Sequence, residues 1–215
     1  MSATARLMAL LLAMLALAAP AAAEGERAGA FDYYVLALSW SPAWCAAEGD
    51  ARGAPECAAG AARGWSLHGL WPQYEAGWPS WCASGARDPS RRETEAMADL
   101  MGSSGLAWHQ WKKHGRCTGL PAADYFALSR RAFAGIARPA ILRRAEAPLR
   151  LAPDVVEAAF REANPAFPPG AIAITCSEGR IAEVRICLTR DLEPRRCGAD
   201  VGRGCGGAAV LEPLR

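Results

Sequence analysis

Apolar residues near the two ends of the chain form short runs that are typical of β-strands. Residues 31–40 (FDYYVLALSW) are dense in aromatic and aliphatic side chains, which predicts a buried strand. Residues 171–176 and 181–189 predict two more strands joined by a hairpin turn over 177–180, and residues 208–211 are expected to add a short strand. The ends of the chain are therefore expected to form a sheet.

Between these runs, apolar residues recur at helical spacing. A Ser-x-x-Glu capping pattern at Ser90 predicts a helix that ends near Gly102. Further helices are expected after Pro121 and over residues 153–163, whereas residues 41–64 are rich in Ala, Gly and Pro and predict loops. Strands at both ends with helices between them indicate an α+β fold, with a central antiparallel sheet packed with several helices.

The first 23 residues have the layout of a secretory signal peptide. A polar start containing Arg6 precedes an apolar run over residues 7–19, and small residues lead to a cleavage position after Ala23. The apolar run is too short for a permanent membrane anchor. We therefore expect a mature protein of residues 24–215 that forms a single domain, is periplasmic or secreted, and does not remain in the membrane.

Composition narrows the possible functions. The 215 residues are 52% hydrophobic and 21% charged, with a formal net charge of +2. This balance excludes a disordered chain and a strongly basic nucleic-acid-binding protein. Nothing in the sequence indicates an obligate protein partner, and we expect a monomer.

Eight cysteines lie in the expected mature protein. In an exported protein an even set predicts four disulfides, and the absence of any CxxC pair makes structural zinc the weaker alternative. Spacing alone leaves the pairing open. The set is Cys45, Cys57, Cys82, Cys117, Cys176, Cys187, Cys197 and Cys205.

The rare basic residues are concentrated in two segments. All three histidines lie in WSLHGLWPQ (residues 65–73) and HQWKKHGRC (residues 109–117), and both lysines lie in the second segment. If residues 109–114 are helical, Lys113, Gln110 and His114 lie about 40°, 100° and 140° from His109 around the axis. One helix face then presents two imidazoles, an ammonium group and an amide. Such a set suits chemistry on a phosphate.

Several reaction types could use such a set of residues. A zinc hydrolase with His68 as third ligand is an alternative, but His109 and His114 are not at the HExxH spacing. A serine nucleophile has no GxSxG motif to support it. RNA supplies its own nucleophile, the 2′-hydroxyl, so that two histidines can act as general base and general acid while a cation stabilises the phosphorane. A disulfide-rich structural or inhibitory protein would leave the clustering unexplained.

The two histidine segments closely resemble the active-site segments of the ribonuclease T2 family, and ALSWSPAWC (residues 37–45) resembles its N-terminal strand in bacterial members. The resemblance extends from about residue 31 to the C-terminus. It implies an α+β fold and metal-independent endonucleolytic cleavage of single-stranded RNA through a 2′,3′-cyclic phosphate. No cofactor is expected, and RNA is the expected partner.

The resemblance also implies roles for individual residues. His114 corresponds to the general base and His68 to the general acid, while His109 holds the phosphate and Lys113 stabilises the transition state. For His68, the neighbouring Gly and Trp-Pro predict a loop. The expected base-binding residues are Trp71, Gln73, Tyr74 and Trp78, and the implied disulfides are Cys45–Cys57, Cys82–Cys117, Cys176–Cys205 and Cys187–Cys197.

One position departs from the family pattern. Gln110 stands where the family usually has Glu, and Arg116 where it usually has Thr. An amide can form a hydrogen bond but cannot accept a proton or contribute charge. Because loss of one transition-state contact typically lowers the rate on the order of 10²–10³-fold, catalysis is expected to be weakened and not abolished. The alternative is a weakened relative that binds RNA or a protein.

Overall fold

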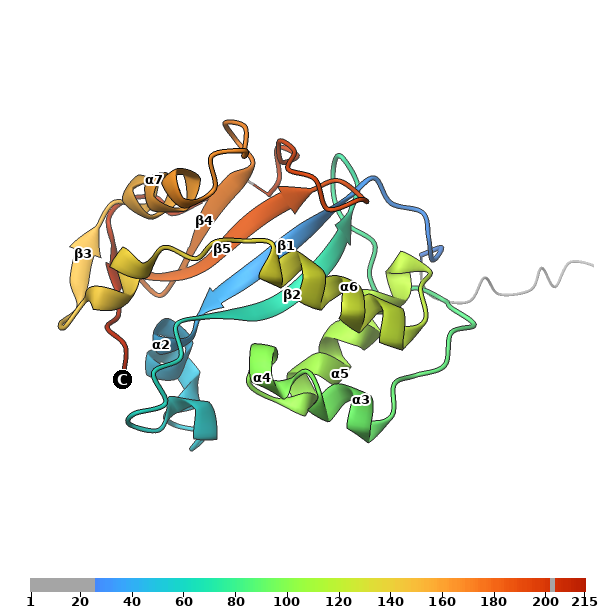
Figure 1. Ribbon diagram of the computed structural model, residues 1–215, viewed down its shortest axis with the longest axis horizontal. Coiled ribbons are helices and arrows are strands. Elements are labelled where there is room, and N and C mark those ends of the chain that lie inside the picture. Colours follow the sequence, from blue (N-terminus) through green and yellow to red (C-terminus); the bar gives the residue numbers. More distant parts are fainter. Residues whose placement is uncertain (1–25, 202–203) are drawn as a thin grey trace, which may run out of the picture.

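The computed structural model describes residues 26–201 and 204–215, which form one sheet with helices packed against it (Figure 1). The expected signal peptide, residues 1–23, lies outside the described residues. Within the described part of the chain, every helix is too short or too polar to cross a membrane.

The sheet has six strands in the described residues, and its centre is the antiparallel pairing of β1 with β5. β1 also pairs antiparallel with β2, which is the edge strand on that side of the sheet. β4 pairs with β5 through the predicted hairpin. The strands are β1 (Tyr33–Trp40), β2 (Trp65–Gln73), β3 (Leu149–Leu151), β4 (Ile172–Ser177), β5 (Arg180–Leu188) and β6 (Ala209–Leu211).

The expected central antiparallel sheet is confirmed by the pairs β1–β2, β1–β5 and β4–β5, and one parallel pairing makes the sheet as a whole mixed. β6 runs parallel to β5 and pairs with it at one position, Arg180 with Val210. The parallel direction follows from the long connection between the two strands, which turns back along the sheet and is tied to β4 by the Cys176–Cys205 disulfide. β3, which the sequence did not predict, pairs antiparallel with β6.

Helices α3 to α6 lie together on one side of the sheet in Figure 1, and α7 lies near β3 and β4. Ser90 and Glu93 form the predicted capping box, and the helical region that follows ends at Gly102, whose φ of 90° favours glycine. The helices are α2 (Ser41–Trp44), α3 (Arg91–Glu95), α4 (Ala98–Met101), α5 (Ser104–Lys113), α6 (Ala122–Ala134) and α7 (Pro153–Ala163).

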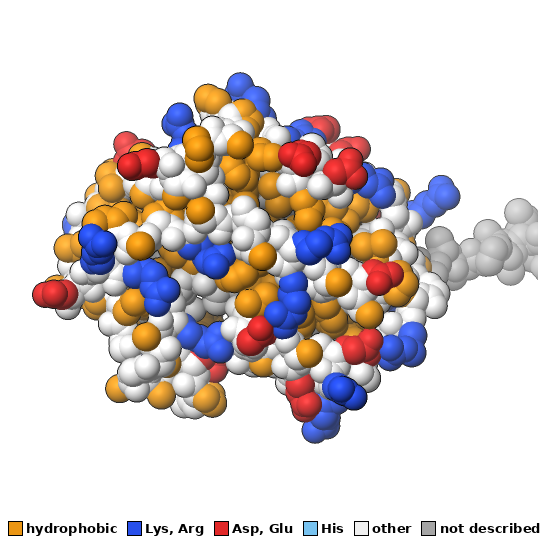
Figure 2. All heavy atoms as spheres, in the orientation of Figure 1, with side chains coloured by type: hydrophobic (Ala, Val, Ile, Leu, Met, Phe, Trp, Pro, Cys, Tyr) orange, Lys and Arg blue, Asp and Glu red, His pale blue; other side chains and the backbone are white. Residues whose placement is uncertain are grey.

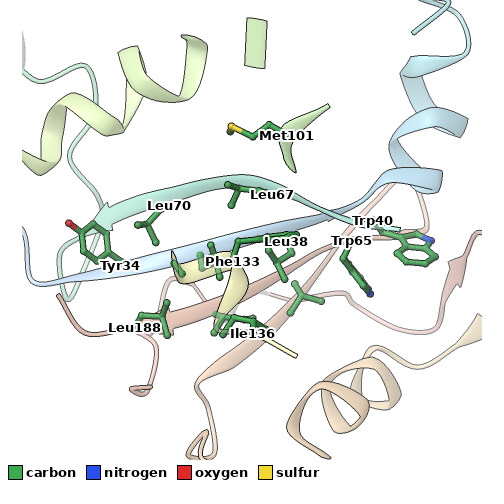
Figure 3. Close-up of a cluster of buried hydrophobic side chains, with 14 of the residues drawn as sticks. Tyr34, Leu38, Trp40, Trp65, Leu67, Leu70, Met101, Phe133, Ile136 and Leu188 are labelled. Carbon is green, nitrogen blue, oxygen red and sulfur yellow. The ribbon is translucent and has the colours of Figure 1, made fainter. Parts of the chain in front are cut away.

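The main hydrophobic core lies between the sheet and helices α4 to α6. Figure 3 shows Phe133 of α6 and Ile136 beside Leu38 of β1 and Leu188 of β5. Met101 of α4 packs onto the same core. The opposite face of the sheet carries a smaller apolar cluster of Tyr33, Val35, Ala173, Cys187 and Val201.

Two loop predictions need correction. Residues 41–64 contain α2, a π-helical turn at Cys45–Gly49 and a 3₁₀ turn at Pro55–Cys57. The segment around His68 is strand β2, because it pairs with β1 along its length. Since β2 lies at the edge of the sheet, Pro72 costs no hydrogen bond to a further strand.

All eight cysteines are paired within the described residues, as four disulfides. The pairs are those that the family resemblance implied: Cys45–Cys57, Cys82–Cys117, Cys176–Cys205 and Cys187–Cys197.

Candidate active site

A β-bulge in β2 places His68 in the site. Ala37 of β1 pairs with Gly69 and the next residue, Leu38, pairs with Leu67, so His68 is the extra residue in the ladder. Side chains of a regular strand alternate between the two faces, and the bulge shifts this alternation by one. His68, Trp71 and Gln73 consequently line one pocket, while Leu67 and Leu70 enter the core.

Helix α5 supplies the opposite wall. Its first turn is capped by the Ser103 side chain, which accepts a hydrogen bond from the backbone N–H of Leu106. Trp111 is fully buried and donates a 2.9 Å hydrogen bond to Asp88, which fixes the rotation of the helix. The pocket therefore receives the other face, with the residues expected from the helical spacing: His109, Gln110, Lys113 and His114.

The pocket has a volume of about 300 Å³ and brings together residues from strands, a helix and two loops. Its lining is Val35, His68, Trp71, Gln73, Trp78, His109, Gln110, Lys113, His114, Glu183, Arg185, Asp200 and Val201. Each of the predicted catalytic residues is in this set. A second, larger hollow of about 610 Å³ adjoins it at His68.

Trp71 lies at the centre of the pocket. Its indole Nε1 donates a 2.7 Å hydrogen bond to Oε1 of Gln110. Its ring meets His68 edge-on at a centroid distance of 5.1 Å and stacks on His114 at 5.2 Å, so that it contacts both imidazoles. A Cβ at Gly69 would collide with Trp71 Nε1 and Gln110 Oε1, which explains the glycine beside His68.

His109 of α5 and His114, the C-cap residue of that helix, are in environments that disfavour a positive charge. Burial, reinforced by the nearby charge of Lys113, lowers the pKa of His114 to about 3. Its buried Nδ1 has no hydrogen-bond partner among the described residues. Partial desolvation and Lys113 also lower the pKa of His109. His114 is therefore a neutral imidazole at physiological pH.

His68 has the opposite environment. Its Nδ1 lies 2.5 Å from Oε1 of Glu183, a carboxylate of β5 whose side chain is only 12% exposed. Burial alone would raise the pKa of Glu183, but the hydrogen bond with His68 and the charge of Arg185 outweigh it and hold this pKa below its ordinary value. A negative charge thus lies directly against His68.

Arg185 completes this side of the pocket. Its Nε and a terminal nitrogen both donate to Oε2 of Glu183, at 3.1 and 3.0 Å. The guanidinium also lies over the Trp71 ring, 5.4 Å from its centroid. Both oxygens of Glu183 are therefore engaged, one by His68 and one by Arg185.

The expected base-binding residues divide into two groups. Trp71, Gln73 and Trp78 line the pocket, and Trp78 is 53% exposed. The Gln73 side chain is buried and donates to the backbone oxygen of Pro72. Tyr74 does not reach the pocket, because it follows the last residue of β2 and packs against the main core.

A disulfide joins the end of α5 to the loop that carries Trp78. Cys117 follows the helix and is bonded to Cys82. The backbone N–H of Trp81 donates a 2.8 Å hydrogen bond to the backbone oxygen of Lys113. The exposed Trp81 ring then meets His109 edge-on at 5.7 Å. The rim of the pocket is thereby held against the wall that α5 forms.

Sequence reasoning missed Glu183, Arg185, Asp200 and Trp81. Glu183 and Arg185 are two apart on a strand and hence share a face, but no local signal indicates that this face adjoins His68. A bulge at Ala182, which lacks a partner on β4, precedes Glu183 and was not predictable from the strand pattern. Asp200 is in a loop, where its carboxylate accepts from the backbone N–H of Gly77.

No group of three or more His, Cys, Asp or Glu side chains in residues 26–201 and 204–215 is arranged to hold a metal ion. His68 is engaged by Glu183, whereas His114 stacks on Trp71. The site is thus organised around hydrogen bonds and ring contacts.

The fold and the motifs have known relatives. A ribonuclease of Aeromonas hydrophila is 45% identical over 107 residues, which are 50% of this chain and 46% of that protein. The chain spans about half the length of several curated relatives that it matches. An RNase-related protein from Calystegia sepium shares the fold with a TM-score of 0.66 and 19% identity, over 85% of this chain and 97% of that one. RNase NT in complex with 5′-AMP is similar with a TM-score of 0.60 and 21% identity, over 86% and 99%.

A family model extends over most of the described chain. The model of the Ribonuclease T2 family matches residues 31–197, a range that begins just before β1 and includes both histidine segments, Glu183 and Arg185. Sequence motifs, fold and family model therefore agree, and the chain belongs to the Ribonuclease T2 family.

Proposed function

We propose that the protein is an exported, metal-independent endoribonuclease that cleaves single-stranded RNA by transphosphorylation. His114 takes the proton of the 2′-hydroxyl, whose oxygen attacks the adjacent phosphorus. The bond from phosphorus to the 5′-oxygen breaks, and His68 donates a proton to that oxygen. The products are a 2′,3′-cyclic phosphate and a free 5′-hydroxyl. His109 binds the phosphate, and Lys113 stabilises the charge of the phosphorane.

The observation that carries this proposal is the contrast between the two imidazoles that contact Trp71. His114 is buried beside Lys113, and its pKa is lowered to about 3, so it is neutral and able to accept a proton. Nδ1 of His68 is engaged by the Glu183 carboxylate at 2.5 Å, which leaves Nε2 to serve the leaving oxygen. A buried neutral imidazole and an imidazole held by a carboxylate are different environments, which supports His114 as the base and His68 as the acid.

The pocket offers stacking surfaces to a nucleobase. Trp71 and Trp78 line it, and aromatic stacking accepts any base because every base has a π-face. The crystal structure of RNase NT, which is similar in fold, is a complex with 5′-AMP, and this supports a nucleotide-containing substrate. Basic and acidic side chains are interspersed on the face shown in Figure 2, which fits weak long-range attraction of RNA and a modest dependence on salt.

Export and chain organisation belong to the same proposal. Four disulfides in a chain of this size are typical of proteins outside the cytoplasm. The signal-peptide pattern that ends at Ala23 supports the same location. We accordingly propose a mature monomeric protein of residues 24–215 without an obligate protein partner.

The purified mature protein should be incubated with single-stranded RNA in EDTA across about pH 4 to 9, and the product ends identified. The proposal expects 2′,3′-cyclic phosphate ends and a bell-shaped rate profile. His68→Ala and His114→Ala should each lower the rate on the order of 10²–10⁴-fold while the disulfides stay intact. Absence of cleavage at every pH by a folded protein would instead favour the binding-only relative, with Gln110 as its cause.

A further inference from the structure

Strand β5 contributes a buried carboxylate to the site that lies outside both histidine segments. Thr175 of β4 pairs with Glu183 and Cys176 pairs with Ile181, so Ala182 is an extra residue at this point of the ladder. Glu183 and Arg185 line the pocket, while the intervening Val184 is fully buried in the core. The bulge and the alternation together direct Glu183 towards His68.

We propose that Glu183 is a positioning residue that fixes the orientation of His68 and holds its proton for donation to the leaving 5′-oxygen. The inference rests on the proposed function and adds a residue to it. Nδ1 of His68 is engaged by Oε1 of Glu183 at 2.5 Å, which leaves Nε2 as the nitrogen that serves the substrate. Arg185 holds the other carboxylate oxygen, so the carboxylate itself has little freedom to turn.

The charges around His68 favour this role. Helix α5 presents Lys113, His109 and His114 to the pocket, and β5 presents Arg185. Glu48, from the turn after α2, lines an adjoining hollow with His68 and Glu183 and forms an ion pair with Arg52. Asp200 accepts a backbone hydrogen bond from Gly77. Among these groups Glu183 is the one that is hydrogen-bonded to His68.

The position of Glu183 also bears on Gln110. Gln110 places a neutral amide against Trp71, beside His114. The Glu183 carboxylate lies across the pocket, against His68. The proposed base, His114, therefore has a neutral amide nearby, whereas the proposed acid, His68, has a negatively charged carboxylate. Removal of the Glu183 charge should therefore impair proton donation and leave proton abstraction intact.

The test compares two substrates that differ in their leaving group. A dinucleoside monophosphate has a 5′-alkoxide leaving group that needs a proton, whereas uridine 3′-(4-nitrophenyl phosphate) releases a stable aryl oxide that does not. Glu183→Gln should lower kcat/KM on the dinucleotide by about 10- to 100-fold and on the aryl ester by less than about threefold. The ratio of the two kcat/KM values is the readout, because a merely structural loss would lower both alike.

Glu178→Gln is the matched control, because Glu178 is an exposed carboxylate in the turn that precedes β5. Glu178→Gln should leave kcat/KM unchanged on both substrates. If Glu183→Gln does not accumulate as folded protein, Glu183→Asp retains the charge but retracts it by one methylene. Glu183→Asp should also lose more kcat/KM on the dinucleotide than on the aryl ester, but both losses should be smaller than those of Glu183→Gln.

The outcomes separate this inference from the proposed function. If the unaltered protein cleaves neither substrate, the proposed function fails. If it cleaves both, and the Glu183 variants lose activity equally on both or lose none, the positioning role is overturned. A loss confined to the dinucleotide, with an unchanged thermal midpoint and intact disulfides, supports it.

Discussion

Trp71 and Gln110 are joined across the pocket by a 2.7 Å hydrogen bond from the indole Nε1 to the amide Oε1. The bond links strand β2, which contains His68, to helix α5, which is capped at its C-terminus by His114. Gln110 is 2% exposed, so its amide replaces water as the partner of the indole. This relationship makes Gln110 a structural part of the site as well as a departure from the family pattern.

Gln110→Glu should raise kcat, on the order of tenfold at neutral pH. A carboxylate can still accept the Trp71 hydrogen bond, and its charge opposes the burial and the Lys113 charge that lower the pKa of His114 to about 3. A more basic His114 abstracts the 2′-proton more effectively, and the acid limb of the kcat profile should move to higher pH. Measurement of kcat against pH on a dinucleotide checks this.

Gln110→Ala serves as the control for that experiment, since it removes the hydrogen-bond acceptor without adding charge. Its kcat should fall below that of the unaltered protein. A kcat for Gln110→Glu that is equal or lower at every pH would contradict the prediction.

Gly69→Ala should disrupt the pocket. Its Cβ would collide with Trp71 Nε1 and Gln110 Oε1, so the hydrogen bond between them must break or the indole must move. We expect kcat/KM to fall about 100-fold, because small displacements of catalytic groups are costly. The steady-state rate on a dinucleotide measures the effect.

Gly85→Ala is the comparison for Gly69→Ala, because nothing lies within 4 Å of a Cβ at Gly85. It should retain full activity. Equal activity of the two alanine variants would show that the site tolerates a side chain at residue 69.

His114 should make the protein less stable in acid. The folded state keeps this ring neutral down to about pH 3, whereas the unfolded chain protonates it near the ordinary value of 6.5. Between these values the unfolded state binds more protons, so the free energy of unfolding falls as pH is lowered. From pH 7 to pH 5 the contribution of His114 is about 2 kcal/mol.

Urea denaturation at pH 7 and pH 5 isolates this contribution when the unaltered protein is compared with His114→Gln, which does not titrate. The loss of unfolding free energy between the two pH values should be smaller in the variant. An equal loss in both proteins would assign the acid sensitivity to other groups, such as Glu183 and Asp99, whose pKa values are also lowered.

The disulfides should differ in their effect on activity. Replacing Cys82 and Cys117 by Ser removes a link across 35 residues and should lower the unfolding free energy by about 4 kcal/mol. It also frees the loop of Trp78 from the end of α5, so kcat/KM should fall by about 10-fold or more. Denaturation and rate measurements on the same preparation test both effects.

Replacing Cys45 and Cys57 by Ser is the paired control. This disulfide spans 12 residues and does not line the pocket, so its loss should cost about 3 kcal/mol of stability and leave kcat/KM unchanged. An equal loss of activity in both double variants would indicate a general effect of destabilisation.

The elements that carry regular patterns were predictable from the sequence. The apolar run of residues 31–40 predicts β1, and the helical spacing of residues 109–114 predicts which side chains of α5 share a face. The rarity of lysine and histidine in this chain makes the placement of Lys113 informative. Such signals are local, because they depend on periodicity within one element.

Features that depend on pairing between distant strands were not predictable. The segment around His68 contains Gly and Trp-Pro, which are loop signals, and it becomes a strand because β1 pairs with it. The contact between His68 and Glu183 joins residues 115 apart in sequence and requires the register of β1 with both neighbours. Strand pattern alone does not fix a register or a bulge.

The bulge at His68 lets β2 hold one residue more than β1 can pair with. Deletion of one residue there would restore regular alternation, and the pairs beyond the bulge would keep their register with β1, so Leu70 would stay in the core and Trp71 in the pocket. If the bulge were instead flattened with every residue retained, the residues beyond it would exchange faces, and Trp71 and Gln73 would turn inward while Leu70 turned outward. The extra residue is therefore what allows Leu67 and Leu70 to reach the core from the same strand that turns His68 and Trp71 towards the pocket.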